Sequence, residues 1–302
     1  MSLFSAGNGM SDRFLLYIDI LGFSEMVRKE PRKVVRVYEI LDTLNVHGRS
    51  DFKVIVFSDT ILVYNSIPAS SVPDRTHCVQ ALVDFASDLH NRLVGQDIFF
   101  RAVLVKGDFE HYKLKNVECF FGSALIDAYH AEKEIPSLGL FVSDDCKAFG
   151  VRHPTVRFSP GLSFVFLCEG LQALSTLGLD RWPFTLGGHL DETFAVNVPW
   201  DVRFLKDVYN QMRENTSPAV RTKYLTAWDL YHQKYNGAMD ALVRHDFETT
   251  ALATDAWTSV TAQMNTKIRK LKRIGSGTEL SKSIQKSSTA LNRKKRFLGI
   301  AP

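Results

Sequence analysis

RFLLYIDILGFSEMV, residues 13–27, places one aspartate, Asp19, in the middle of an apolar run that is typical of a strand. Burying an unpaired carboxylate is costly, so we expect a positive group beside Asp19. Further along, FKVIVFSDTILVY (residues 52–64) places Asp59 between two stretches rich in β-branched residues, with Ser58 beside it. Two carboxylates carried on strands in this way can hold a pair of divalent cations.

The hydrophobic periods of the first half of the chain predict strands and helices in alternation. We expect strands at residues 13–21, 52–57, 60–65 and 98–109, and helices from Pro31 onward and along the apolar stripe from Val79 to Leu93. The resulting order, β-α-β-β-α-β, is the ferredoxin-like arrangement of the α+β class. In that topology the first strand lies beside the hairpin, so Asp19 and Asp59 are expected at one end of the sheet.

Each aspartate also has an interpretation that involves no ligand. Asp59 alone could cap the turn of a hairpin, and Asp19 alone could be a buried aspartate whose oxygens accept backbone amides. The two together, on strands that this topology makes neighbours, favour a cation site.

The chain resembles the class III nucleotidyl cyclases over residues 12–150, through the strings IDILGFSEMV, FSDT, RAVLVKGDF, FFGSALIDAYHAEKE and GLFVSDDCKAF. Within that superfamily, YIDILGFS, FSDTI and GSALIDAYHAEKE are most similar to the pyrimidine cyclases of Pycsar, a bacterial antiphage system. The resemblance implies a cyclase palm over residues 1–155. It also implies conversion of UTP to cyclic UMP and pyrophosphate by attack of the ribose 3′-hydroxyl on the α-phosphate. The product would act on a cyclic-nucleotide-binding effector.

Other functions stay open at this point. One is a cytidylate cyclase that makes cyclic CMP, and another is a degenerate cyclase fold that only senses nucleotides. A polymerase-like or diguanylate-forming palm shares the two-metal topology, but the sequence has no GGDEF-like hairpin string. Retention of both Asp19 and Asp59 favours catalysis over sensing.

The resemblance also implies roles for particular residues. Asp19 and Asp59 would be the catalytic carboxylates and would bind two Mg²⁺ or Mn²⁺ ions, with the Ile20 carbonyl completing one shell. Ser58 would lie beside the nucleotide. Four residues at the start of the next helical segment would present backbone amides to the triphosphate: Leu21, Gly22, Phe23 and Ser24.

The base-reading positions depart from those of purine cyclases. Where purine-cyclising members carry a Lys or Glu, four residues before the second aspartate, this chain has Ile55. The other base-reading position holds Cys119, which could equally be a small thiol of the core. The missing charge at Ile55 argues against purines, and the choice of UTP over CTP rests on the resemblance alone.

The positions of the usual transition-state Asn and Arg hold Ile126 and His130. Either another cation serves here or the register differs. His130 could be a phosphate ligand or an ordinary surface residue. Arg101 and Lys106, on and after the fourth strand, are alternative phosphate contacts, although a lysine at a strand end is commonly only solvated.

Composition sets the remaining bounds. With 302 residues, 45% of them hydrophobic, the chain can form one large domain or two smaller ones. No apolar run approaches the roughly 18 residues that span a bilayer, and the first residues lack the pattern of a signal peptide. The four cysteines show no pairing or metal-type spacing, which is typical of reduced thiols and predicts a cytoplasmic protein.

The second half of the chain divides by composition into an extension and a tail. Residues 156–265 are expected to be mostly helical and to complete the core or a dimer. Residues 266–302 form a basic tail, expected to be solvated and flexible or to contact nucleic acid or another anionic surface. Class III sites are commonly built between two chains, so the resemblance implies a homodimer with shared sites.

Overall fold

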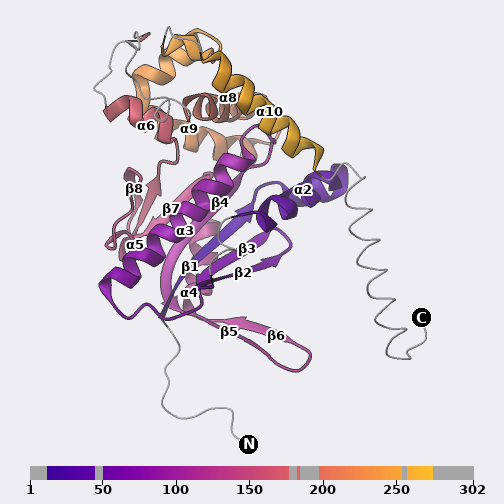
Figure 1. Cartoon of the computed structure of the whole chain (residues 1–302), viewed down its shortest axis with the longest axis vertical. Helices are drawn as coiled ribbons and strands as arrows, with labels where there is room; N and C mark the ends of the chain where they lie inside the picture. The colour runs from indigo at the N-terminus through magenta and orange to yellow at the C-terminus, as the bar shows by residue number, and fades with distance from the viewer. Residues whose placement is uncertain (1–11, 45–49, 177–181, 184–196, 254–256, 275–302) are drawn as a thin grey trace, which may run out of the picture.

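In the part of the chain that the structure describes, seven strands form one sheet in the order β2-β3-β1-β4-β7-β9-β8, and β5 pairs with β6 in a separate ribbon (Figure 1). The structure is a computed structural model, and it describes residues 12–44, 50–176, 182–183, 197–253 and 257–274. The strands are β1 (Asp12–Ile20), β2 (Phe52–Phe57), β3 (Thr60–Asn65), β4 (Phe100–Asp108), β5 (Glu110–Lys113), β6 (Glu118–Phe121), β7 (Gly139–Ser143), β8 (Thr155–Ser159) and β9 (Leu162–Val165). The helices are α1 (Phe23–Lys29), α2 (Pro31–Asp42), α3 (Val72–Leu93), α4 (Ser123–Glu134), α5 (Asp144–Lys147), α6 (Glu169–Thr176), α8 (Val198–Glu214), α9 (Pro218–Arg244) and α10 (Thr258–Arg273), with a short 3₁₀ turn η2 (Thr249–Ala251).

The α+β class and the ferredoxin-like order of the first half are confirmed. Strand β1 lies between β3 and β4 and is antiparallel to both, and helices precede β2 and β4. The hairpin β2–β3 has the bounds that the sequence predicts. Helix α2 begins at Pro31, a residue whose fixed φ suits the first helical position and whose missing N–H is not needed there. The order therefore follows from local sequence signals.

The two faces of the sheet bury different residues because side chains alternate along a strand. On β1, Leu16 and Ile18 join the apolar cluster formed with α2 and α3. Leu15 and Tyr17 join the cluster formed with α4, α8 and α9 on the opposite face. Asp19 has the same parity as Tyr17, so its carboxylate points toward the α4 face.

Residues on both sides of position 155 share the sheet. Strand β9 pairs antiparallel with β7, and β8 pairs with β9 at the edge. Helices α6, α8 and α9 gather beyond one end of the strands (Figure 1) and bury their apolar residues in the same cluster as the α4 face. The described residues after position 155 thus share one core with the first half, and they contribute strands as well as helices.

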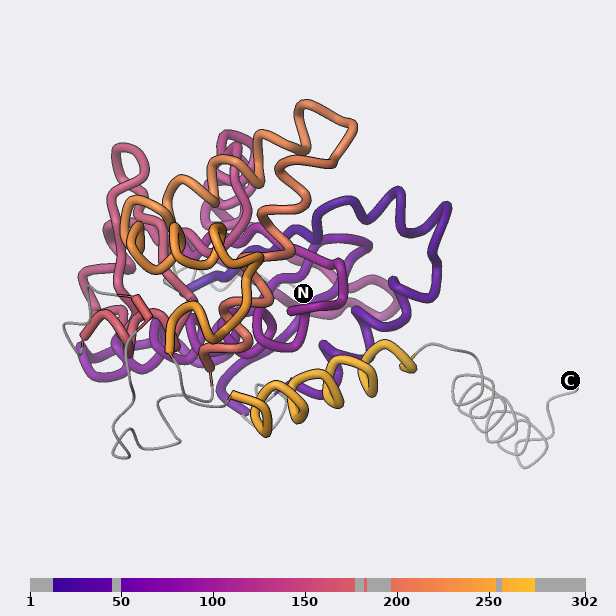
Figure 2. Tube along the Cα trace, turned by 90° about the horizontal axis from the view of Figure 1, so that it is seen from above, coloured from indigo at the N-terminus to yellow at the C-terminus, as the bar shows by residue number. Residues whose placement is uncertain are grey.

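Helix α10 runs back along the edge of the molecule beside α2 (Figure 2). The Arg36 guanidinium donates to the carbonyl of Lys272 at 2.8 Å, and the Gln96 amide donates to the carbonyl of Ile268 at 3.2 Å. The beginning of the predicted tail is therefore the last part of a docked helix, up to Arg273. The rest of that tail, from residue 275, lies outside the described residues. No described helix has the length and apolar character needed to cross a membrane.

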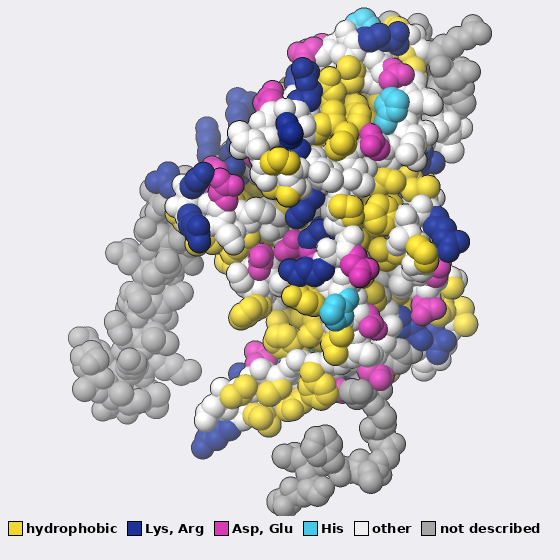
Figure 3. Space-filling model, turned by 180° about the vertical axis from the view of Figure 1, so that it is seen from behind, with side chains coloured by type: hydrophobic (Ala, Val, Ile, Leu, Met, Phe, Trp, Pro, Cys, Tyr) yellow, Lys and Arg dark blue, Asp and Glu magenta, His cyan; other side chains and the backbone are white. Residues whose placement is uncertain are grey.

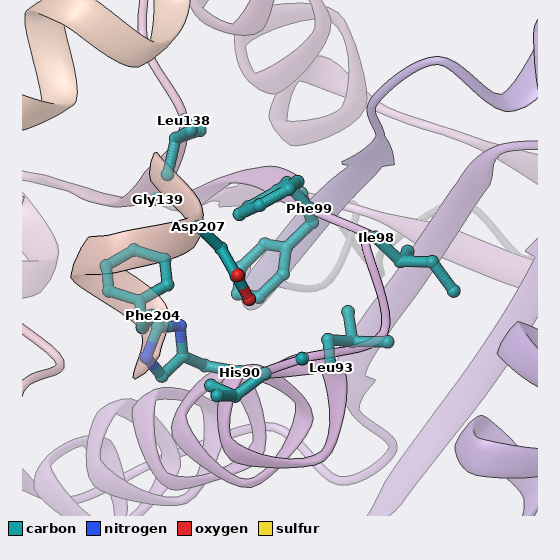
Figure 4. A pocket seen from close by; sticks show the side chains of 11 residues that line it. His90, Leu93, Ile98, Phe99, Leu138, Gly139, Phe204 and Asp207 are labelled. Carbon is teal, nitrogen blue, oxygen red and sulfur yellow. The ribbon is translucent and has the colours of Figure 1, made fainter. Parts of the chain in front are cut away.

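A cavity of about 20 Å³ lies where α3, α8 and the start of β4 meet (Figure 4). Its lining includes His90, Phe99, Phe204 and Asp207, and the His90 and Phe204 rings lie edge to face with centroids 4.5 Å apart. This volume accommodates about one water molecule, so the cavity cannot hold a nucleotide.

We expect His90 to make the stability of the fold sensitive to acid. Burial lowers the pKa of His90 from 6.5 to about 4, so below pH 6.5 the unfolded chain binds a proton that the folded chain excludes. The free energy of unfolding should therefore fall as the pH is lowered from about 6.5 to 4, by up to about 1.4 kcal/mol per pH unit. The prediction is checked by measuring the free energy of unfolding in urea at pH 7 and at pH 5, for the wild type and for His90→Gln. The variant should lose about 2 kcal/mol less on acidification, and the exposed His245→Gln should behave as wild type. Equal losses in all three proteins would contradict the prediction.

Candidate active site

The backbone brings Asp19 and Asp59 together at one end of the sheet, as the sequence predicts. Asp19 lies opposite Thr60 of β3 on one side and opposite Arg101 of β4 on the other. The amide of Ile20 donates to the carbonyl of Asp59 at 3.0 Å. The hairpin turn is therefore joined to the end of β1, and the two aspartates lie within mutual electrostatic influence.

The turn that carries Asp59 is tight and held from outside. Its two residues are Ser58 and Asp59, because Phe57 pairs directly with Thr60. Ser58 has φ 57°, in the left-handed region that a serine seldom occupies, and the Tyr38 hydroxyl donates to the Ser58 carbonyl at 3.0 Å. Strained backbone of this kind persists only where surrounding contacts hold it.

Arg101 is the positive group that the sequence requires beside Asp19. Its guanidinium lies 3.4 Å from an Asp19 oxygen, contacts the Glu132 carboxylate of α4, and donates to the carbonyl of Ile135. The Arg101 side chain is only 7% exposed. Arg101 was also a candidate phosphate contact, but in this structure its nitrogens face Asp19 and α4. It therefore acts as the internal counter-ion of Asp19.

The electrostatics of Asp19 depend on more than one cation. Burial raises the pKa of Asp19; Arg101 opposes this, Asp59 adds to it, and Lys223 and Lys133 lower the pKa again. Lys133 lies on α4, one residue after Glu132, and Lys223 lies on α9. Neither lysine was identified from the sequence, because both reach the site only through tertiary packing.

The segment after β1 differs in one respect from its expected role. The amide of Leu21 donates to the Phe99 carbonyl at 2.9 Å, so it cannot also bind a phosphate. Gly22, with φ 73°, is the N-cap of α1, and the amides of Gly22, Phe23 and Ser24 precede the first backbone bonds of the helix, which run from Glu25 and Met26 to the Gly22 carbonyl. Phe23 is buried in the α2–α3 cluster and Ser24 is exposed. The backbone amides from Gly22 to Ser24 are thus left as the candidates.

An apolar pocket of about 360 Å³ adjoins the aspartates on the α4 face. Its lining residues come from β1, the hairpin, β6 and α4: Tyr17, Phe57, Thr60, Leu62, Phe120, Leu125, Ile126, Tyr129 and His130. The Tyr17 and Thr60 hydroxyls lie 3.4 Å apart where the pocket meets Asp19. Small-molecule sites typically have this size and this mixture of apolar walls and a few polar groups.

The remaining predicted residues lie at different distances from this centre. Ile55 pairs with Leu62, a pocket residue, and packs at the margin of the same face. Cys119 lies on the β5–β6 ribbon, where its neighbour Phe120 lines the pocket and Cys119 does not. Lys106 lies five residues along β4 from Arg101, on the opposite face and ~17 Å away, so within one chain it does not reach Asp19. The side of the molecule away from α3 shows basic and acidic side chains next to one another near its middle, between hydrophobic areas (Figure 3).

No protein-family model matches the chain, and no curated protein matches it. Solved structures of nucleotidyl cyclases do align with about half of the chain. The guanylyl cyclase domain of the RhoGC fusion protein from the aquatic fungus Blastocladiella emersonii aligns with 16% identity and a TM-score of 0.42, covering 52% of this chain and 95% of that one. The adenylyl cyclase CyaB from P. aeruginosa aligns with 10% identity and a TM-score of 0.37, covering 52% and 95%. Alignments this weak do not place the chain in a family, so its chemistry has to be inferred from its own residues.

The residues of the centre fit divalent cations of the Mg²⁺ or Mn²⁺ type. Among the described residues, no group of three or more His, Cys, Asp and Glu side chains is arranged to hold a metal by itself. Asp19, Asp59 and the Ile20 carbonyl offer oxygen atoms only. Such ions are usually bound through one or two carboxylates, with waters and substrate phosphates filling the other positions. This donor set therefore suits a cation that arrives with a nucleotide.

Proposed function

We propose that the chain is a nucleotidyl cyclase that converts UTP to cyclic UMP and pyrophosphate. The observation that carries this proposal is the placement of two strand-borne carboxylates, Asp19 and Asp59, at one end of a ferredoxin-like sheet next to a pocket of nucleotide-compatible size. The class III motifs in the sequence support the same chemistry. The wider role we propose is cytoplasmic synthesis of a second messenger for an effector in antiphage defence.

The chain's own residues would position the substrate. Asp19 and Asp59 would hold the cations, and the amides from Gly22 to Ser24 would face phosphate oxygens. When bound, Mg²⁺ or Mn²⁺ would lower the pKa of the ribose 3′-hydroxyl and neutralise charge on the triphosphate. Arg101 keeps the Asp19 carboxylate aligned through a fixed guanidinium. The hydroxyl proton would pass to water.

The pyrimidine preference rests on the absence of a polar reader at Ile55. A purine whose edge found no partner there would lose about 1–3 kcal/mol of binding. The pocket walls are mainly apolar and aromatic, which suits stacking of a base and does not select uracil over cytosine. Cyclic CMP is therefore the alternative product.

Exposed apolar side chains around the pocket support a homodimer with shared sites. They lie on the β5–β6 ribbon, the hairpin and α4: Phe57, Tyr112, Leu114, Val117, Phe121, Ile126 and Tyr129. Phe57 at the pocket edge is 71% exposed. Apolar surface gathered around a pocket is typical of an interface, and a partner chain would place Cys119 next to a base from the other side.

One observation favours a second candidate, a nucleotide sensor without turnover. The Arg101 guanidinium neutralises Asp19 at 3.4 Å, which weakens the need for a cation there. A sensor would bind nucleotide and release it unchanged, so product analysis separates the two candidates.

The decisive test is incubation of the purified protein with equimolar UTP, CTP, ATP and GTP and Mn²⁺, followed by mass spectrometry of the products. We expect cyclic UMP to dominate because Ile55 offers a purine edge no partner. Dominant cyclic AMP or cyclic GMP would overturn the pyrimidine assignment, and dominant cyclic CMP only the choice of uracil. Nucleotide binding without any cyclic product would favour the sensor.

A further inference from the structure

The start of α9 packs on Phe99, the residue before β4, and Phe99 is hydrogen-bonded to the residue that follows β1. The Tyr224 ring packs edge-on against Phe99, with ring centroids 5.0 Å apart. Phe99 in turn accepts the Leu21 amide through its carbonyl at 2.9 Å, two residues after Asp19. Lys223, which precedes Tyr224, is thereby carried to the charged centre by a helix that lies outside the ferredoxin-like core.

Six charged groups from five parts of the chain gather at this centre. The carboxylates are Asp19, Asp59 and Glu132, and the cations are Arg101, Lys133 and Lys223. Arg101 is engaged by Asp19 and Glu132. Among the described residues no ion pair is formed by Lys223 or Lys133, and the Lys133 ammonium lies 5.2 Å from the centre of the Tyr129 ring.

Lys223 therefore lacks a direct counter-ion although it is half-buried. The pKa of Lys223 is lowered, and burial is the largest cause. The nearby cations Arg101 and Lys133 also lower the pKa of Lys223, whereas Asp19 raises it. An ammonium that faces two other cations in a partly desolvated position is stabilised by an added anion. Asp19 is the carboxylate that raises the pKa of Lys223, and Arg101 already engages it at 3.4 Å.

We propose that Lys223, assisted by Lys133, contacts the polyphosphate of the nucleotide beside Asp19 and Asp59. This inference rests on the proposed cyclase function. It assigns to Lys223 the role of the positive group that stabilises the transition state, since the positions usual for that role hold Ile126 and His130. In cyclisation the 3′-oxygen bonds to the α-phosphorus and the bond from that phosphorus to the bridging oxygen breaks. Its electron pair leaves on pyrophosphate, and the hydroxyl proton goes to water. Negative charge therefore builds on the leaving group, where a fixed ammonium lowers the barrier.

The test compares Lys223→Met with Lys223→Arg. The methionine keeps the length and apolar stem of the side chain and removes the charge, so the fold should hold, which thermal melting verifies. We expect kcat/KM of Lys223→Met to fall on the order of 100-fold, mainly in kcat, and pyrophosphate to inhibit it about tenfold more weakly. Lys223→Arg should recover most of both. A Lys223→Met enzyme within twofold of wild type in kcat and in pyrophosphate inhibition would overturn the inference.

Arg221→Met is the matched control. Arg221 also lies in the first turn of α9 and is exposed, and two residues of helix separate its direction from that of Lys223 by ~200°. Arg221→Met removes one positive charge, as Lys223→Met does, and it should leave kcat and pyrophosphate inhibition within twofold of wild type. An Arg221→Met defect equal to that of Lys223→Met would show a general charge effect and contradict a specific contact.

Binding of inorganic tripolyphosphate with Mn²⁺, measured by calorimetry, separates this inference from the proposed function. One outcome is that wild type binds the probe, that Lys223→Met binds it at least about tenfold more weakly, and that wild type forms no cyclic nucleotide. In that case the phosphate contact stands and the cyclase proposal fails. If wild type cyclises nucleotide and the variant binds the probe as tightly as wild type, the cyclase proposal stands and the contact fails. Absence of both turnover and probe binding in wild type would overturn both.

Discussion

Replacing Asp19 or Asp59 with alanine is expected to reduce cyclase turnover on the order of 1,000-fold. In the proposed cyclase the two carboxylates would together hold the cations, which would lower the pKa of the hydroxyl and neutralise the triphosphate, so neither aspartate could substitute for the other. The measurement is cyclic-nucleotide formation at saturating UTP and Mn²⁺, with circular dichroism and melting to show that each variant folds.

Asp42→Ala is the control for this pair of variants. Asp42 lies exposed at the last position of α2 and should leave turnover unchanged. Retention of more than about a tenth of wild-type rate by either site variant would rule out a role for both aspartates in holding the cations.

Removing the Arg101 charge should have the largest effect on stability. Arg101→Met leaves Glu132 and Asp19 without their buried counter-ion, and breaking a buried pair from one side costs about 3–5 kcal/mol. Urea unfolding at pH 7 measures this loss. The guanidinium also donates to the Ile135 carbonyl at the end of α4, so the variant should loosen α4 against the sheet.

A double variant shows whether the loss comes from the charge or from packing. Arg101→Met combined with Glu132→Gln removes the cation and the more deeply buried of its two carboxylates. If unpaired charge is the cause, the double variant should be more stable than Arg101→Met alone. A double variant as unstable as the sum of the single variants would assign the loss to packing instead.

The parts of the fold that the sequence predicts are those governed by local signals. The hairpin bounds follow from two β-branched runs around a two-residue turn, and the start of α2 follows from Pro31. The position of Asp59 next to β1 follows from topology once the order of the elements is known. The period of two along β4 also carries the information that Lys106 and Arg101 face opposite sides of the sheet, so the sequence already indicates that the two cannot contact the same group within one chain.

The rest of the site depends on contacts between distant segments. Arg101 and Glu132 are unremarkable in their own strings, and only the packing of α4 on β4 makes them an ion pair. Lys223 lies far along the chain from Asp19, in a helix whose pattern predicts only a buried stripe. Neither periodicity nor spacing reports which helix end approaches which strand end. Lys133 and Lys223 therefore could not be derived from the sequence, which indicates Arg101 only as a candidate phosphate contact.

The continuity of the sheet across residue 155 bears on how this protein could be divided. A chain ending there would leave β7 without β9, and the unpaired N–H and C=O groups of an open edge promote association with other chains. It would also lose the helices that cover the α4 face. The segment with the cyclase-like motifs is therefore not an interchangeable module, and its transfer to another protein requires the residues that follow it.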